Sequence, residues 1–381
     1  MRQRTLSAFV VVFTLIAAQA AFAQPAPRQT SNNAALRYWQ AFAHTPELNE
    51  ERQKSLADAL APGGKLSDEH VKLLDDGRDA LLYLRRGAAL KECDWGLHYE
   101  DGPYLLLPQL VRSRNLARLA ALRTRHRLAG GDGKGAVEDT LDALTLARHA
   151  GADGTMVSYL VQLAIEQVAT ESLAAGMAGL DPAALDLAAK RLESLPPGGS
   201  LAATTKTEKE SFFDWARTRL RSMKDDEPWQ ETILKPLGDQ SGALEQAIEQ
   251  AGGTRQGVLE QLDAFAPYYG EVAKILPLPR DQFLARHKEL RAGVEKNPIG
   301  KLIVPAYEMA YGRDQAGRTR MMMLKAAVAI ARGGPEKARG LKDAGGNPIE
   351  YRATETGFEL LSPITDRDKQ VKLTVGGKAK G

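Results

Sequence analysis

Residues 105–128 read LLLPQLVRSRNLARLAALRTRHRL, and this stretch decides the fold class. At about 100° per residue, its apolar side chains form two stripes that lie well over a quarter-turn apart. One stripe contains Leu110, Ala117, Ala121 and Leu128, and the other contains Val111, Leu119 and Leu122. A helix with two apolar stripes has to pack against neighbours on both sides. The stretch therefore predicts an antiparallel array of stacked helices.

The residues that follow supply the second helix of a hairpin. Gly130-Gly131-Asp132-Gly133 predicts a turn. The apolar stripe after this turn contains Ala136, Val137, Thr140, Leu141, Leu144 and Ala147. With its alanine-rich first helix and its Gly-Asp turn, the pair resembles one tetratricopeptide-type unit of about 34 residues. No repeat at this period is visible elsewhere, so we expect a degenerate or solitary unit.

Helical periodicity also covers the rest of the N-terminal half. Helices are expected at 33–43, 48–60, 67–93 and 156–177, and from Asp181 to the Pro-Pro-Gly-Gly cluster at 196–199. The 156–177 segment is apolar on almost every side, which predicts a central buried helix. The cluster at 196–199 predicts the main domain boundary, with an N-terminal helical array over residues 24–199.

A second helical region is expected over residues 200–342, and a small β tail over 343–381. Helices are expected at 201–224, 241–252, 255–275, 279–295 and 306–332, with a loop at 225–241. Met321-Met322-Met323 predicts an adaptable apolar face. Residues 348–354 and 358–362 alternate at period two, which predicts a β-hairpin, and 371–375 can add a third strand. The fold class is thus mainly α, resembling an α-solenoid, with a small C-terminal β-hairpin.

The first 23 residues have the pattern of an export signal. Arg2 and Arg4 precede an apolar run over residues 8–18, and Ala21-Phe22-Ala23 precedes Gln24. This order predicts a cleaved Sec-type signal peptide, cut between Ala23 and Gln24, and a periplasmic or secreted protein. The apolar run is too short for a membrane-spanning helix, so no transmembrane segment is expected after cleavage.

Composition narrows the functional classes. The net charge of the 381-residue chain is +3, and loss of Arg2 and Arg4 leaves +1, a balance that argues against a nucleic-acid partner. Cys93 is the single cysteine, so no intrachain disulfide can form, and we interpret it as a buried small hydrophobe. The common hydrolase and dinucleotide motifs are absent from the sequence, as is metal-ligand spacing among its six histidines. We therefore predict no cofactor and no metal, and leave open whether the protein is an enzyme.

The loop at 94–104 concentrates the candidate binding residues, which are Asp94, Trp95, His98, Tyr99, Glu100 and Asp101. Their carboxylates could act in acid–base chemistry or bind a cation, and the two aromatic rings could stack on a sugar or a peptide. The alternative interpretation is a connector whose carboxylates cap helices and whose tryptophan plugs the core. Arg114 and Arg118 are candidates for an anion groove on 105–128, or else a solvated face. Glu166 is expected to pair with an arginine of that same stretch.

Several segments resemble an uncharacterised family of exported bacterial helical proteins, which implies no assigned activity. They are Arg37–Phe42, Cys93–Leu97, Tyr99–Pro103, Gly133–Gly151 and Phe212–Trp215. The stretch 343–362 resembles the small β end of type II secretion pseudopilins. The leading hypothesis is an interaction or scaffold module of the cell envelope that binds a protein or peptide in a helical groove. The alternative is a hydrolase or carbohydrate-binding protein that uses the 94–104 loop.

Overall fold

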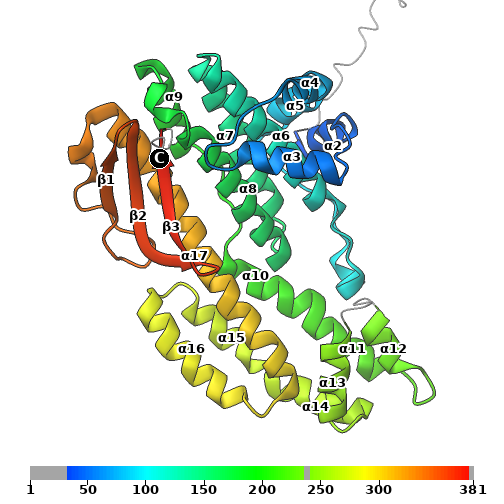
Figure 1. Cartoon of the computed structure of the whole chain (residues 1–381). Coiled ribbons are helices and arrows are strands. Elements are labelled where there is room, and N and C mark those ends of the chain that lie inside the picture. The colour runs from blue at the N-terminus through cyan, green and yellow to red at the C-terminus, as the bar shows by residue number, and fades with distance from the viewer. Residues whose placement is uncertain (1–31, 236–240, 377–381) are drawn as a thin grey trace, which may run out of the picture. The chain divides into compact units, whose positions relative to one another are not determined.

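The computed structural model describes residues 32–235 and 241–376, and those from Asn33 onward belong to one compact unit. They are mainly helical, with a three-stranded antiparallel sheet at the C-terminal end (Figure 1). This confirms the predicted fold class. The predicted signal peptide, residues 1–23, and its cleavage point lie outside the described residues. Among those described, no helix is both long and apolar enough to cross a membrane.

The described residues of the N-terminal half form eight α-helices. They are α2 (Ala34–Ala43), α3 (Glu50–Leu60), α4 (Asp68–Asp76), α5 (Arg78–Ala88), α6 (Pro108–Ala129), α7 (Gly133–Gly151), α8 (Met156–Ala174) and α9 (Pro182–Glu193). The single helix predicted over 67–93 is wrong, because the chain breaks at Gly77 between α4 and α5. A Cβ atom at Gly77 would lie only 2.5 Å from the Leu119 side chain, so the absence of a side chain at this glycine lets α6 approach closely.

Helix α6 is packed on more than one side, as its two stripes predict. It contacts α7 and α8, and it also contacts each helix from α2 to α5. Leu110 and Ala117 of one stripe are buried, and so is Leu119 of the other. Val111 departs from the prediction: it is 63% exposed, near the N-terminal end of the helix.

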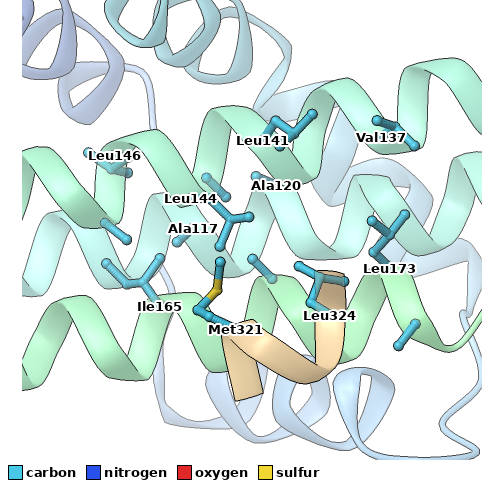
Figure 2. Close-up of a cluster of buried hydrophobic side chains, with 14 of the residues drawn as sticks. Ala117, Ala120, Val137, Leu141, Leu144, Leu146, Ile165, Leu173, Met321 and Leu324 are labelled. Carbon is cyan, nitrogen blue, oxygen red and sulfur yellow. The ribbon is translucent and has the colours of Figure 1, made fainter. Parts of the chain in front are cut away.

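Helix α8 lies in the centre of the array, as predicted for 156–177. It packs against α6, α7 and the long C-terminal helix α17 (Pro298–Gly333). Figure 2 shows Met321 and Leu324 of α17 among the apolar side chains of α6, α7 and α8. Met321 and Met323 are therefore core residues, and only Met322 is exposed. The predicted adaptable methionine face is wrong, because α8 and the neighbouring helices cover it.

The second half adds shorter elements before and after α17. They are α10 (Leu201–Thr207), the π-helix η3 (Glu208–Asp214), α11 (Trp215–Ser222), α12 (Trp229–Leu234), α13 (Gly242–Gln250), α14 (Arg255–Phe265), α15 (Pro267–Ile275), α16 (Arg280–Val294) and η5 (Pro335–Ala338). The short 3₁₀ helix η2 (Met177–Gly179) precedes α9 in the N-terminal half. The helix predicted over 255–275 is split before Pro267. Phe265, Tyr268, Tyr269 and Tyr307 form an aromatic core beneath these helices.

The C-terminal sheet has the order β1-β2-β3, with β1 (Glu350–Thr354), β2 (Gly357–Asp366) and β3 (Lys369–Val375). Arg367 and Asp368 both adopt positive φ, which gives the tight hairpin turn between β2 and β3. Strands β2 and β3 pack against α17, and the Gly376 N–H donates to the Ala174 carbonyl of α8. Both the predicted hairpin and the possible third strand are thus present.

Candidate functional site

The segment of residues 90–95, which we call the strap, ends on a buried tryptophan that is hydrogen-bonded to α7. The Trp95 indole N–H donates to the His149 carbonyl at 3.0 Å, and the ring stacks on Tyr38 and Phe42. Trp95 is therefore held inside the aromatic core. This arrangement matches the interpretation in which the tryptophan plugs the core, and it leaves no open ring face for stacking on a sugar.

The start of α2 fixes the strap in place. The Asn33 amide donates to the Asp94 carbonyl at 2.8 Å and accepts from the Asp94 N–H at 2.9 Å. One residue on, the Ala34 N–H donates to the Glu92 carbonyl. Beneath the strap, Tyr38 is hydrogen-bonded to the His149 ring, and burial lowers the pKa of His149 to about 4. The imidazole is therefore neutral at pH 7.

The first hollow is a groove between α5 and α9, both of which pack along α7. Its volume is about 630 Å³, within the usual range for ligand sites. The lining residues are Arg85, Ala88, Ala89, Leu90, Lys91, Glu138, Asp142, Thr145, Arg191, Ser194, Leu195, Pro196 and Pro197. The groove thus has small apolar side chains on both walls, at the C-terminal ends of α5 and α9.

The floor of the groove is an ion-pair network. Arg85 bridges Glu138 at 3.1 Å, Asp139 at 3.2 Å and Asp142 at 3.0 Å. Burial raises the pKa of Asp142, and the Arg85 guanidinium opposes that shift. Arg191 lies in the last turn of α9, where a cation complements the helix dipole. The floor is therefore close to charge balance.

The second hollow, which we call the loop pocket, has a volume of about 460 Å³ and lies at the C-terminal end of α7. It is lined by Cys93, Asp94, Trp95, Gly96, Leu97, His98, Tyr99, Ala152 and Asp153. Four of the predicted binding residues, Asp94, Trp95, His98 and Tyr99, are therefore brought together here. Glu100 and Asp101 are exposed and stand outside the lining.

Side chains of this loop also make contacts of their own. The Tyr99 hydroxyl donates to the Asp153 carbonyl, and burial raises the pKa of Tyr99 to about 12. His98 lies 3.2 Å from Glu100, whose pKa is lowered by its own backbone N–H and then by His98. Neither contact assembles a general acid with a general base.

Asp153 is the residue that the sequence interpretation missed. It follows α7 and is largely buried, and its Oδ1 accepts from the Thr155 N–H at 2.9 Å. Its Oδ2 lies 3.5 Å from Nε2 of the buried Gln109. Burial raises the pKa of Asp153. The Asp-Gly-Thr order before α8 signals a capped helix start, but it carries no sign that the 94–104 loop lies beside it.

The arginines of α6 do not join either hollow. Arg114 and Arg118 stand outside both linings, and burial, followed by the charge of Arg114, lowers the pKa of Arg118. The expected pairing of Glu166 with an α6 arginine is wrong: its partner is Arg148 of α7, at 3.2 Å. Arg125 instead donates to the Leu60 and Ala61 carbonyls at the C-terminal end of α3.

Comparisons with known proteins add no family to this picture. No family model matches the chain, and neither a curated protein nor a solved structure matches it. The functional argument therefore rests on the two hollows and the side chains that line them.

Proposed function

We propose that this protein is an interaction module that binds an extended segment of a partner protein in the groove between α5 and α9. The observation that carries the proposal is the groove itself, a hollow of about 630 Å³ along the face of α7. The predicted signal peptide places the module and its partner in the cell envelope or outside the cell. The predicted tetratricopeptide-like hairpin, α6 and α7, supplies its platform.

The lining favours an extended peptide over a small polar ligand. Ala88, Ala89 and Leu90 on one wall face Leu195, Pro196 and Pro197 on the other. Such walls accept alternate side chains of an extended chain. The hydroxyls of Thr145 and Ser194 donate to the Leu141 and Arg191 carbonyls, so their oxygens can act only as acceptors for a bound backbone. Because the floor is close to charge balance, binding should depend only weakly on salt.

The test is a blocking substitution with a matched control. Ala89 is exposed and lines the groove, so Ala89→Trp fills the hollow without entering the core. Ala292→Trp makes the same change on the exposed face of α16, away from both hollows. Peptides selected from a random dodecamer phage library against the purified chain are synthesised, and their affinities are measured by fluorescence anisotropy.

We expect selected peptides to share apolar positions and to lose tenfold or more in affinity with Ala89→Trp but not with Ala292→Trp. A library that yields no enriched peptide overturns the proposal. So does a peptide that binds Ala89→Trp as tightly as the parent chain. A hydrolase or carbohydrate-binding role for the 94–104 loop stays a prediction, and the buried face of Trp95 disfavours its sugar-stacking form.

A further inference from the structure

We infer that the loop pocket is a second, independent site, which binds an organic cation: a guanidinium or primary ammonium group. The pocket shares no lining residue with the groove between α5 and α9. Two carboxylates, Asp94 and Asp153, line it together with Tyr99, while the Trp95 ring, which also borders the pocket, is stacked on Tyr38 and Phe42. Carboxylates combined with aromatic rings are the surroundings in which proteins hold organic cations.

Asp153 lacks the cation that several buried carboxylates of this chain have, and in this it is like Asp343, which is also held by neutral donors. Asp139 contacts three arginines, Glu166 contacts Arg148, and Asp314 contacts Arg318. In the described part of the chain, Asp153 has only neutral hydrogen-bond donors. A buried carboxylate without a cationic partner is costly, and a cation bound from solution would remove that cost.

Glu208 is a second buried carboxylate without a cationic partner, and it increases the unbalanced negative charge behind the pocket. Glu208, the first residue of the π-helix η3, accepts from the Met156 N–H at 2.9 Å. Burial raises the pKa of Glu208, and the charge of Asp153 adds to this shift. Across the described residues Glu208, like Asp153, has no lysine or arginine within ion-pair distance. The two acids therefore favour a cationic occupant together.

A buried amide oxygen without a hydrogen-bond partner also favours a ligand with N–H donors. Gln109 is fully buried, and its amide lies against Asp153, with Nε2 at 3.5 Å from Oδ2. The Oε1 atom of this amide has no hydrogen-bond partner among the described residues. A buried acceptor of this kind costs free energy until a donor reaches it. An N–H group held at Asp153 would bring such a donor to the same place.

The donor set fits an organic cation better than a metal ion. Within the described residues, no group of three or more His, Cys, Asp or Glu side chains is placed to hold a metal. The pocket is also far larger than an ion, at about 460 Å³, and Tyr99 gives it an aromatic wall. A flat guanidinium can stack on the Tyr99 ring while its N–H groups reach Asp94 and Asp153.

The experiment is isothermal titration calorimetry of the purified full chain with n-butylguanidinium and with its neutral isostere n-butylurea. We expect the cation to bind and the urea not to bind. Asp153→Asn should weaken binding by tenfold or more, since it removes a charge-assisted hydrogen bond. Asn keeps an acceptor for the Thr155 N–H, so the start of α8 is preserved. Asp94→Asn, at an exposed position, is the second test if Asp153→Asn does not fold.

Asp101→Asn is the matched control, because Asp101 is an exposed acid of the same loop outside the pocket lining. Two further arms distinguish the source of the cation. Tighter binding of agmatine than of an Arg-containing pentapeptide indicates a free amine, and the reverse indicates a basic side chain of a protein. The inference is overturned if butylurea binds equally well, if Asp101→Asn weakens binding as much as Asp153→Asn, or if calcium chloride alone displaces the cation stoichiometrically. Lack of binding at millimolar concentration also overturns it, whatever the peptide groove does.

Discussion

Replacement of Trp95 by alanine should destabilise the fold more than any other single change in the strap. The side chain is buried, stacks on Tyr38 at 5.7 Å and on Phe42 at 6.2 Å, and meets Trp39 edge-on. Loss of a buried tryptophan costs about 3–5 kcal/mol through lost transfer free energy and the cavity that remains. The unpaired His149 carbonyl adds about 1 kcal/mol. Trp95→Ala should therefore lower the free energy of unfolding by about 5 kcal/mol.

The assay is urea unfolding followed by circular dichroism at 222 nm, which reports on helices and does not depend on tryptophan emission. Trp229→Ala is the control, because Trp229 is only half-buried and α12 has no buried residue. It should cost less than half as much. Trp95→Phe, which keeps a ring and loses the N–H bond, should fall between the parent chain and Trp95→Ala. A cost below about 1 kcal/mol for Trp95→Ala, the size of one ordinary hydrogen bond, would refute the structural role of this residue.

Three further predictions concern the same region. Gly96 and Gly102 both have positive φ, but only a Cβ at Gly102 would meet Trp215, at 2.5 Å. Gly96→Ala should therefore lower the free energy of unfolding by about 1 kcal/mol and Gly102→Ala by clearly more, as measured by the same unfolding assay. Burial raises the pKa of Cys93 to about 12, so its thiol should react with Ellman's reagent at pH 8 at under a tenth of the rate in urea, and equal rates would contradict its burial. Burial raises the pKa of Glu208 in the folded chain, so the folded state keeps this proton to a higher pH than the unfolded state does, and stability falls as pH rises through the folded pKa. Glu208→Gln should remove that part of the pH dependence and leave the chain more stable than the parent at pH 7 but not near pH 4; a parent chain that gains stability relative to the variant as pH rises would exclude this assignment.

The sequence predicts the fold of this chain better than its sites, and the reason is physical. Periodicity reports which face of a helix is buried, so the two stripes of α6 and the all-round apolarity of α8 are visible locally. It does not report which neighbour covers a face. The sequence therefore predicts that Met321 is available to a partner, although this side chain is buried where α17 packs against α8.

The candidate residues show the same division. Asp94, His98 and Tyr99 lie within six positions of one another, so the sequence identifies them as one loop, and they do line one pocket. Asp153 and Gln109, which give that pocket its chemistry, come from the start of α8 and the start of α6, more than 40 residues apart. Their meeting depends on how α6, α7 and α8 pack, and a single sequence contains no local sign of it.

The two hollows follow from one helix face. Glu138, Asp142 and Thr145 recur at helical spacing along α7 and form part of the groove lining. His149 continues that stripe, and Trp95 of the strap is hydrogen-bonded to its carbonyl. Ala152 and Asp153 follow at the end of α7 and line the loop pocket. The strap thus divides one face into a groove whose charges are paired and a pocket whose carboxylates are not. Added salt should weaken ligand binding strongly only in the pocket, where net negative charge attracts the ligand. In the groove, Asp142 is paired with Arg85, whereas Asp153 has no such cation among the described residues.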